Sequence, residues 1–395
     1  MKKIKRREHG FSVITLILVI LIIFVCFIIF SAFTGEDTTS TIDYQNYFEE
    51  ELASTDNVAL RYYYTQLEEP EKIMYTTILE NIDSLKSGTQ SIKFPSSVSD
   101  SIIENGGSGD ENYFQSAWDA VTLDNLELFF VDTSKLSVST RTSSFLSYRS
   151  YGFTLSPQSG MTYYNSSFNS EEEVNNAISE VQRIANEVVA NATGSRYNKV
   201  MYVHDWLVDN LIYDNDNSAN KDNIYGTFIN KKVVCEGYAE GLKYLLDKLN
   251  IPCVLVYGDG YDDNGNVEAH AWNYVQMEDG NWYAVDTTWD DPIYVGSSNS
   301  IMPNNYKHKY LLKGSKTFNV NHVSDGDVSG SGQNFKYPEL AENDYEWERT
   351  KAGSFNFVLL LNLHRPRLCS CANFTNVKLC AMLLLYRKNL IFPIQ

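Results

Sequence analysis

The chain has 395 residues and a formal net charge of −18, with 43% hydrophobic and 13% aromatic residues. Chains of this length usually fold into two units, and this composition supplies enough apolar side chains for a sizeable core. Acidic residues dominate between positions 11 and 345, whereas residues 1–10 and 346–395 are basic. Because an acidic body repels phosphate groups, binding to nucleic acid is not expected.

The N-terminus predicts a membrane anchor. The basic segment 1–10 precedes residues 11–33, which contain no charged side chain. At about 1.5 Å per residue a helix of that length spans a bilayer, and its basic flank stays cytoplasmic. We therefore expect a single-pass cell-membrane protein with its folded part outside the cell. An alternative is processing after Gly10, because HGFSVITLIL is similar to the leader junction of type IV prepilins. Thr15 stands where that family usually has Glu.

Residues 34–57 are polar and acidic, which is typical of a linker. Residues 58–160 then predict a small N-terminal α+β unit. Pro70 is well placed in the first turn of a helix, and SSFLSYRSYGFTLS is rich in the aromatic residues that favour strands. No motif of known chemistry occurs in this unit, so its role is not predicted.

A second unit is predicted over residues 170–325. It opens with Ser170 and Glu173 at the spacing of a helix-capping box, and a second amphipathic helix follows. The segments PCVLVYG, AHAWNYVQM and WYAVDTTW then read as consecutive strands, so helices followed by an antiparallel sheet indicate an α+β fold. Residues 326–345 form a closing extension. Residues 346–395 reverse the charge of the chain, as a frameshifted or disordered tail would.

Six cysteines are too few for a disulfide framework in an exported protein of this size. Three of them lie in the tail at a C-x-C-x8-C spacing that fits no zinc pattern, so neither a metal nor another cofactor is expected. Only Cys235 and Cys253 lie in the predicted folded body. Cys253 belongs to an apolar strand and is expected to be a buried thiol.

Cys235 occupies the point where the strand-like KVV gives way to an amphipathic helix. At the N-terminus of a helix the unpaired N–H groups and the dipole favour a thiolate. The backbone N–H of Cys235 is also a natural donor to an oxyanion. The competing interpretation is a second buried thiol.

His270 and Asp286 lie on two strands joined by Glu278-Asp279-Gly280. A two-residue Asp-Gly turn would put these side chains on opposite faces of the hairpin. A three-residue loop with Gly280 in the left-handed conformation pairs Met277 with Asn281, and it makes Asp286 a diagonal neighbour of His270 on one face. Their Cβ atoms would then be about 5–8 Å apart, within reach of a hydrogen bond.

The motifs VVCEGYAEG, HAWNYV and WYAVDTTWDDP, in this order, resemble the core motifs of the transglutaminase-like superfamily, a papain-related fold. The resemblance covers about residues 170–325. Within the superfamily, the sequence is similar to the anchored extracellular proteins of Gram-positive bacteria. It implies an antiparallel sheet packed on the nucleophile helix, with Cys235 as nucleophile, His270 as general acid and base, and Asp286 as its orienting carboxylate. Tyr225 is a candidate second oxyanion donor or a core residue. Trp272 and Trp289 are core residues or contacts in a substrate cleft.

The resemblance further implies a cysteine enzyme that acts on carboxamide or peptide bonds of a protein or peptide substrate, such as one at the cell wall. A thioester acyl-enzyme would form, and water or a lysine amine would accept the acyl group, with hydrolysis favoured over cross-linking. The alternative is a non-catalytic adhesion or assembly module on the same fold.

Overall fold

The computed structural model describes residues 61–109, 112–145, 148–262, 264–291, 307–328 and 332–347. By its internal contacts the chain divides between Tyr345 and Glu346. Among the described residues no helix is both long and apolar enough to cross a membrane. The predicted span at 11–33, the linker and nearly all of the basic tail lie outside the described residues.

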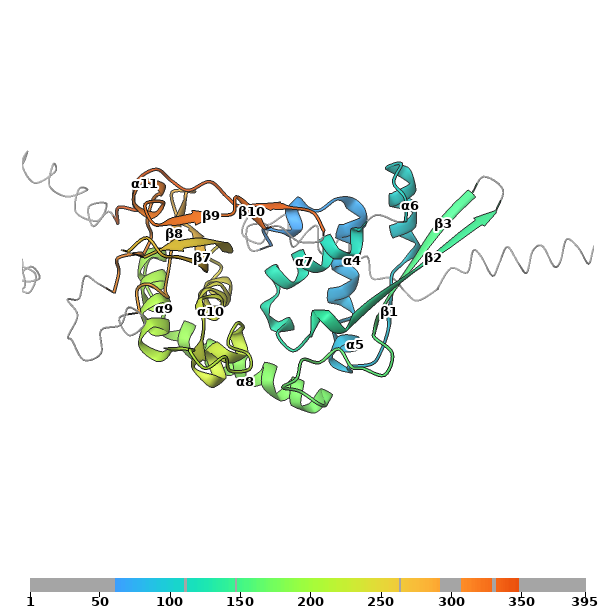
Figure 1. Ribbon diagram of the computed structural model, residues 1–395, viewed down its shortest axis with the longest axis horizontal. Helices are drawn as coiled ribbons and strands as arrows, with labels where there is room; N and C mark the ends of the chain where they lie inside the picture. The colour runs from blue at the N-terminus through green and yellow to red at the C-terminus, as the bar shows by residue number, and fades with distance from the viewer. Residues whose placement is uncertain are drawn as a thin grey trace, which may run out of the picture. The chain divides into compact units, whose positions relative to one another are not determined.

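Residues 64–157 combine short helices with a three-stranded sheet (Figure 1). Pro70 lies in the first turn of α4, as predicted, and the expected extended segment contains the end of β2 and most of β3, which pair as a long hairpin. The sheet has the order β1-β3-β2. The elements are η1 (Tyr64–Gln66), α4 (Glu69–Glu80), α5 (Ile82–Lys86), β1 (Ile92–Lys93), α6 (Ser96–Glu104), α7 (Tyr113–Asp124), η2 (Leu126–Leu128), η3 (Thr133–Lys135), β2 (Leu136–Phe145) and β3 (Tyr148–Pro157).

Helices then precede a second sheet. Ser170 caps α8 by accepting a hydrogen bond from the Glu173 backbone, as the capping pattern predicted. The following short strands β4 and β5 pair in parallel just before α10. The elements are α8 (Glu171–Asn191), α9 (Arg196–Asn210), β4 (Ile212–Tyr213), the π-helix η4 (Gly226–Asn230), β5 (Lys232–Val233) and α10 (Cys235–Lys248).

The second sheet is antiparallel, with the strand order β8-β7-β6-β9. Helix α10 packs on it, and the Asn273 side chain of β7 donates to the Ala239 carbonyl of the helix at 2.9 Å. Mixed α/β architecture is thereby confirmed. The remaining elements are β6 (Cys253–Tyr261), β7 (Val267–Gln276), β8 (Trp282–Val285), α11 (Ser315–Phe318), β9 (His322–Ser324), β10 (Asp327–Val328) and β11 (Phe335–Lys336).

The β7–β8 hairpin has the predicted three-residue loop. Gln276 pairs with Trp282, and the Met277 N–H donates to the Asn281 carbonyl at 3.0 Å. Gly280 has φ of 80°, the left-handed conformation that this loop requires. In this register the even-numbered residues of β7, among them His270, lie on the same face of the sheet as Asp286, which directly follows β8.

Two glycines of β6 make room on that face. Gly258 pairs with His270 on one side and with Ser324 on the other, and Gly260 pairs with His322. A Cβ on Gly258 would lie 2.2 Å from the Val323 carbonyl, and one on Gly260 would lie 2.7 Å from the Trp289 ring. The YGDGY sequence thus leaves space for the rings of Trp272 and Trp289 and for the backbone of β9.

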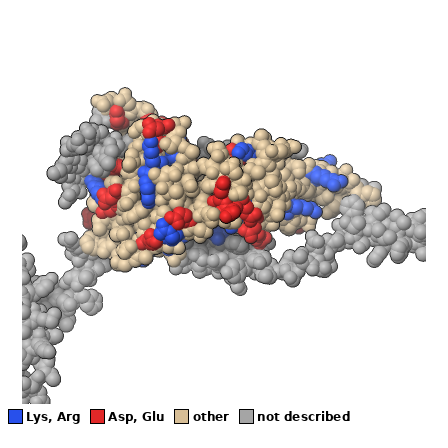
Figure 2. Space-filling model, turned by 90° about the horizontal axis from the view of Figure 1, so that it is seen from below, with Lys and Arg blue, Asp and Glu red and all other residues tan. Residues whose placement is uncertain are grey.

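Tyr63, just before η1, contacts the β8-β7-β6-β9 sheet directly. The Tyr63 hydroxyl, fully buried, donates to the Leu255 carbonyl of β6 at 2.8 Å, and its ring packs edge-on against Phe335. On the face shown in Figure 2, acidic and basic side chains lie side by side on the left, whereas an acidic group in the middle and basic groups toward the right lie apart. The charges on the left therefore have neighbours of opposite sign.

Candidate active site

Cys235 is the first residue of α10, as predicted, and its side chain is partly exposed. The first turn of α10 packs closely against the preceding chain, because a Cβ on Gly237 would lie 2.5 Å from Val233 and 2.8 Å from the Lys221 carbonyl. As the first helical residue, Cys235 has a backbone N–H without an intrahelical acceptor. By contrast, Cys253 is buried in β6, and burial raises its pKa well above the usual range, so that thiol stays protonated.

His270 and Asp286 form a buried pair. His270 Nε2 lies 2.8 Å from Asp286 Oδ2, and both side chains are almost completely shielded from solvent. Burial alone would lower the pKa of His270. The charge of Asp286 and its hydrogen bond, together with the hydrogen bond that the ring donates to Cys235, outweigh burial and raise that pKa to about 10. The structure thus brings all three predicted residues together, because the His270 side chain makes hydrogen bonds with both Asp286 and Cys235.

The carboxylate of Asp286 is held from two sides. Its Oδ1 accepts the backbone N–H groups of Thr288 at 2.9 Å and Trp289 at 3.1 Å, while Oδ2 faces histidine. Burial would raise the pKa of Asp286, but the charge and hydrogen bonds of His270 and His322 hold it below its usual range. Asp286 is therefore an acceptor-only carboxylate at neutral pH.

His322 is the site residue that sequence reasoning missed. Its Nε2 lies 3.0 Å from the same Asp286 Oδ2, and the ring is fully buried. The sequence offered no carboxylate partner for His322, because β9 pairs with β6 on the side away from β7 and this pairing is not visible in the sequence. A signal was available in retrospect, since Gly258 and Gly260 leave a face of β6 bare between two histidine-bearing strands.

Trp272 and Trp289 pack against His270 and His322. The Trp289 ring stacks on His270 with centroids 5.2 Å apart, and it lies 4.4 Å from His322. Trp272 packs at 5.9 Å from His270 and 5.2 Å from His322. Both indoles are buried. Their described contacts are those of core residues around the site, and a role in a substrate cleft stays a prediction.

Tyr225 packs its ring against Phe129 and Phe168, at 5.7 and 5.4 Å. These contacts correspond to the core role that was its alternative, and an oxyanion role stays a prediction. Tyr213 of β4, which sequence reasoning passed over, lies near the thiol. Burial first, and then the charges of Cys235 and Glu268, raise the pKa of its phenol to about 12.

A second His–Asp–His group lies on α9 and beyond it. Asp205 Oδ1 is 3.1 Å from His204 Nδ1 and 2.6 Å from His308 Nε2, and His204 Nε2 is 3.1 Å from Asp290 Oδ2. The ligand-type atoms of His204, Asp205 and His308 are near enough to surround a metal ion. Each already takes part in this hydrogen-bond chain, which gives both ring nitrogens of the buried His204 a partner.

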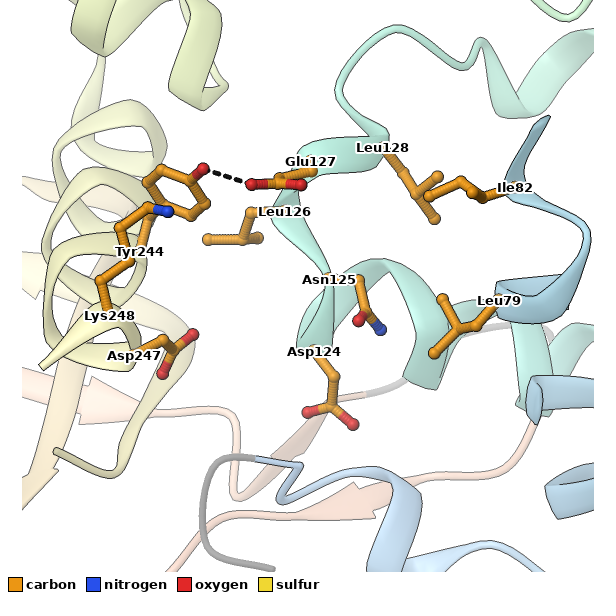
Figure 3. Close-up of a pocket in the computed structure, with 10 residues that line it drawn as sticks. All are labelled: Leu79, Ile82, Asp124, Asn125, Leu126, Glu127, Leu128, Tyr244, Asp247 and Lys248. Atoms are coloured by element: carbon orange, nitrogen blue, oxygen red, sulfur yellow. Dashed lines mark hydrogen bonds between the residues drawn. The ribbon is translucent and has the colours of Figure 1, made fainter. Parts of the chain in front are cut away.

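A cavity of about 280 Å³ lies between η2 and α10 (Figure 3). None of its lining residues belongs to the group around Cys235. Three carboxylates face it, and the Tyr244 hydroxyl donates to one of them, Glu127. Its walls are formed by Leu79, Ile82, Asp124, Asn125, Leu126, Glu127, Leu128, Tyr244, Asp247 and Lys248.

The family model described as the transglutaminase-like superfamily matches residues 182–287. This segment contains Cys235, His270 and Asp286, and it ends before His322. No curated protein matches the chain.

Similar solved structures include a protein described as a TGase, with 16% identity over 56% of this chain and a TM-score of 0.28. The chain spans 59% of that protein's length. A candidate cysteine protease from Cytophaga hutchinsonii has 17% identity over 40% of this chain and 68% of its own, with a TM-score of 0.23. The periplasmic domain of TgpA from Pseudomonas aeruginosa, bound to ethylmercury, has 18% identity over 40% and 66%, with a TM-score of 0.24.

The family match and the motifs within it agree: residues 182–287 of this chain form a domain of the transglutaminase-like superfamily.

Proposed function

We propose that the chain is a membrane-anchored extracellular cysteine enzyme that cleaves carboxamide or peptide bonds of a protein or peptide through a thioester acyl-enzyme. The observation that carries the proposal is the buried His270–Asp286 pair beside Cys235 at the start of a helix. A binding module has no need for a thiol, an imidazole and a carboxylate held in this order.

The geometry supports a specific sequence of proton transfers. The Cys235 thiolate attacks the carbonyl carbon, and the Cys235 backbone N–H supports the resulting oxyanion. His270 gives a proton to the leaving nitrogen as the C–N bond breaks, which leaves a thioester. His270 then takes a proton from water, whose oxygen attacks the thioester carbon. The C–S bond breaks, and the acid and the thiolate are released.

A lysine amine in place of water would give an isopeptide cross-link through the same acyl-enzyme. We favour water as the acceptor, as the family resemblance suggests for members outside the cross-linking branch. The net charge of −18 suits a cationic substrate, and it supports neither acceptor over the other.

The proposed location rests on the sequence. Residues 11–33 carry no charge behind a basic flank, and the folded body has only two cysteines, Cys235 and Cys253. Digestion of intact cells with an external protease should remove the folded part while leaving the basic N-terminus protected. N-terminal sequencing of the native protein tests the alternative: a start at Phe11 would mean prepilin-like processing rather than a retained anchor.

Trapping of the acyl group tests the function. The full chain is incubated with a glutamine-containing peptide library and a biotinylated primary amine, and the products are identified by mass spectrometry. Deamidated or cleaved peptides that disappear in Cys235→Ala indicate hydrolysis, and biotinylated peptides indicate transfer. Cys253→Ala is the matched control, because it removes the buried thiol. If Cys235→Ala and wild type give the same products, the chain is not this enzyme.

A further inference from the structure

One oxygen of Asp286 serves two imidazoles. Oδ2 lies 2.8 Å from His270 Nε2 and 3.0 Å from His322 Nε2, whereas Oδ1 is occupied by two backbone N–H groups. The two backbone hydrogen bonds hold the carboxylate in one orientation. The carboxylate therefore cannot rotate to offer Oδ1 to one histidine and Oδ2 to the other. The two histidines therefore compete for the same lone pairs.

A proton must lie on Nε2 of His322. Asp286 is ionised and only accepts, so each ring nitrogen that faces Oδ2 has to be a donor. On the other side of the ring, Nδ1 lies 2.9 Å from the Asn321 amide, whose nitrogen lies 2.7 Å from the Tyr310 hydroxyl. An imidazolium satisfies this arrangement directly. A neutral ring with its proton on Nε2 keeps the bond to Oδ2 and accepts from the Asn321 amide once the amide is turned, because the Tyr310 hydroxyl can then donate, but it gives up the hydrogen bond to the Phe318 backbone.

The His322 ring is held in this position by its surroundings. It stacks on Phe318 with centroids 4.0 Å apart and planes at 21°, and Trp289 lies 4.4 Å away. Its backbone is in register with Gly260, whose missing side chain leaves room for the rings. An apolar side chain would fill such a pocket at lower cost than a buried imidazole, so packing alone gives no reason for a histidine here.

We propose that His322 is a positioning residue that shares Asp286 Oδ2 with His270 and so limits how tightly the carboxylate holds the His270 imidazolium. This inference rests on the proposed function. An imidazolium held by an undivided carboxylate would be a poor acid toward the leaving nitrogen. The positive end of the His322 Nε2–H points at the shared oxygen and disfavours the second positive charge nearby.

The direction of the effect does not depend on the charge of His322. Both the neutral ring with a proton on Nε2 and the imidazolium oppose protonation of His270. The other titratable groups that face the pair are Cys235 from α10, Tyr213 from β4, the buried carboxylate of Asp290, which interacts electrostatically with Asp286, and Tyr310, whose ring is 5.2 Å from His322. All of these groups are present in the wild type and in both variants of His322.

The test measures the pH dependence of Cys235 alkylation by iodoacetate in the full chain. This anionic reagent is drawn to the thiolate while His270 is charged, so the rate falls when His270 loses its proton. Replacement His322→Phe should move the midpoint of this fall upward by about one pH unit, a tenfold gain in proton affinity. His322→Gln keeps an N–H donor toward Oδ2 and should leave the midpoint within about 0.3 units of wild type.

The outcomes separate the two proposals. Equal midpoints in wild type and both variants overturn the role of His322 and leave the proposed function standing. Alkylation of wild-type Cys235 no faster than that of a model thiol overturns the proposed function itself.

A second measurement uses the wild-type chain, so it does not depend on whether a variant of His322 folds. Nitrogen-15 NMR of labelled histidine side chains in the wild-type chain reports which nitrogen of each ring is protonated. A proton on Nε2 of His322 throughout the titration of His270 is expected. A neutral ring with its proton on Nδ1 would overturn the proposal.

Discussion

His270 Nε2 lies 2.8 Å from Asp286 Oδ2 in a site from which solvent is excluded, and four hydrogen bonds converge on this one carboxylate. In a buried site a charged acceptor is worth more than on the surface, and its loss leaves the imidazolium without a counter-charge. The pair is therefore the element of the site whose disruption should have the largest effect on reactivity.

Asp286→Asn should lower kcat by on the order of 10³-fold or more, as in other triads whose carboxylate is made neutral. The amide is uncharged and has one accepting oxygen, so it cannot serve both the backbone N–H groups at Oδ1 and the histidines at Oδ2, and the His270 ring loses both its orientation and its counter-charge. Cys235 alkylation at neutral pH should slow in parallel. Asp262→Asn is the matched control, because that exposed carboxylate accepts only within its own turn. Activity of Asp286→Asn near that of the control would contradict the assigned role.

The raised pKa of His270 predicts a pH-dependent stability. The pKa is about 10 in the folded protein, against about 6.5 when unfolded. The stabilisation is complete below about pH 6.5, and it is lost as the pH rises toward 10, by at most about 1.4 kcal/mol per pH unit. The difference in the free energy of unfolding between wild type and His270→Gln should therefore shrink over this range.

Urea denaturation at pH 6, 8 and 10 measures this difference. His308→Gln is the matched control, because it removes a histidine that is also paired with a carboxylate, Asp205, but is 33% exposed. A difference for His270→Gln that stays constant from pH 6 to pH 10 would mean that the ring is not charged in the folded protein.

Local patterns predicted the part of the site that lies within one hairpin and one helix start. Gly280 determined the loop length, the loop determined the register, and the register put His270 and Asp286 on one face. The position of Cys235 followed from the change of period at the end of β5. These inferences needed only neighbours in sequence.

The rest depended on long-range pairing that a single sequence does not reveal. His322 reaches Asp286 because β9 adds to β6 rather than to β8, at a separation of more than fifty residues from His270. The Tyr63–Leu255 hydrogen bond likewise joins segments that had been assigned to different units. Neither contact leaves a periodic signal, since each is made by a single side chain.

Gly258→Ala should destabilise the protein by about 1–3 kcal/mol, the usual range for overpacking. The added Cβ would meet backbone atoms of β9, at 2.2 Å from the Val323 carbonyl and 2.7 Å from Ser324 Cα. Relief would require β9 to separate from β6, which would carry His322 away from Asp286. Gly152→Ala in β3 is the control, because the nearest atom would be 3.9 Å away. Equal urea midpoints for the two variants would contradict this account of β6.

Lys243→Met tests the buried charges beside the cavity of Figure 3. The Lys243 ammonium is 1% exposed and lies 2.7 Å from Asp247 Oδ2. Burial raises the pKa of both Asp247 and Asp124 to about 6, and Lys243 opposes that rise. Without the cation, ionising these carboxylates should destabilise the protein by about 3–5 kcal/mol at pH 7.

At pH 5 both carboxylates are largely protonated, so the cost of Lys243→Met should be smaller than at pH 7. The sign follows because a raised pKa in the folded protein means that ionised Asp247 and Asp124 destabilise the fold. Lys243 offsets this destabilisation, and there is less to offset at a pH where the carboxylates are protonated. Lys248→Met, on the same helix with its ammonium 4.7 Å from the Tyr244 ring centroid, is the matched control and should change stability little at either pH. Urea denaturation of both variants at the two pH values provides the measurement. A cost for Lys243→Met that is equal at pH 5 and pH 7 would mean that the carboxylates beside the lysine do not titrate in this range.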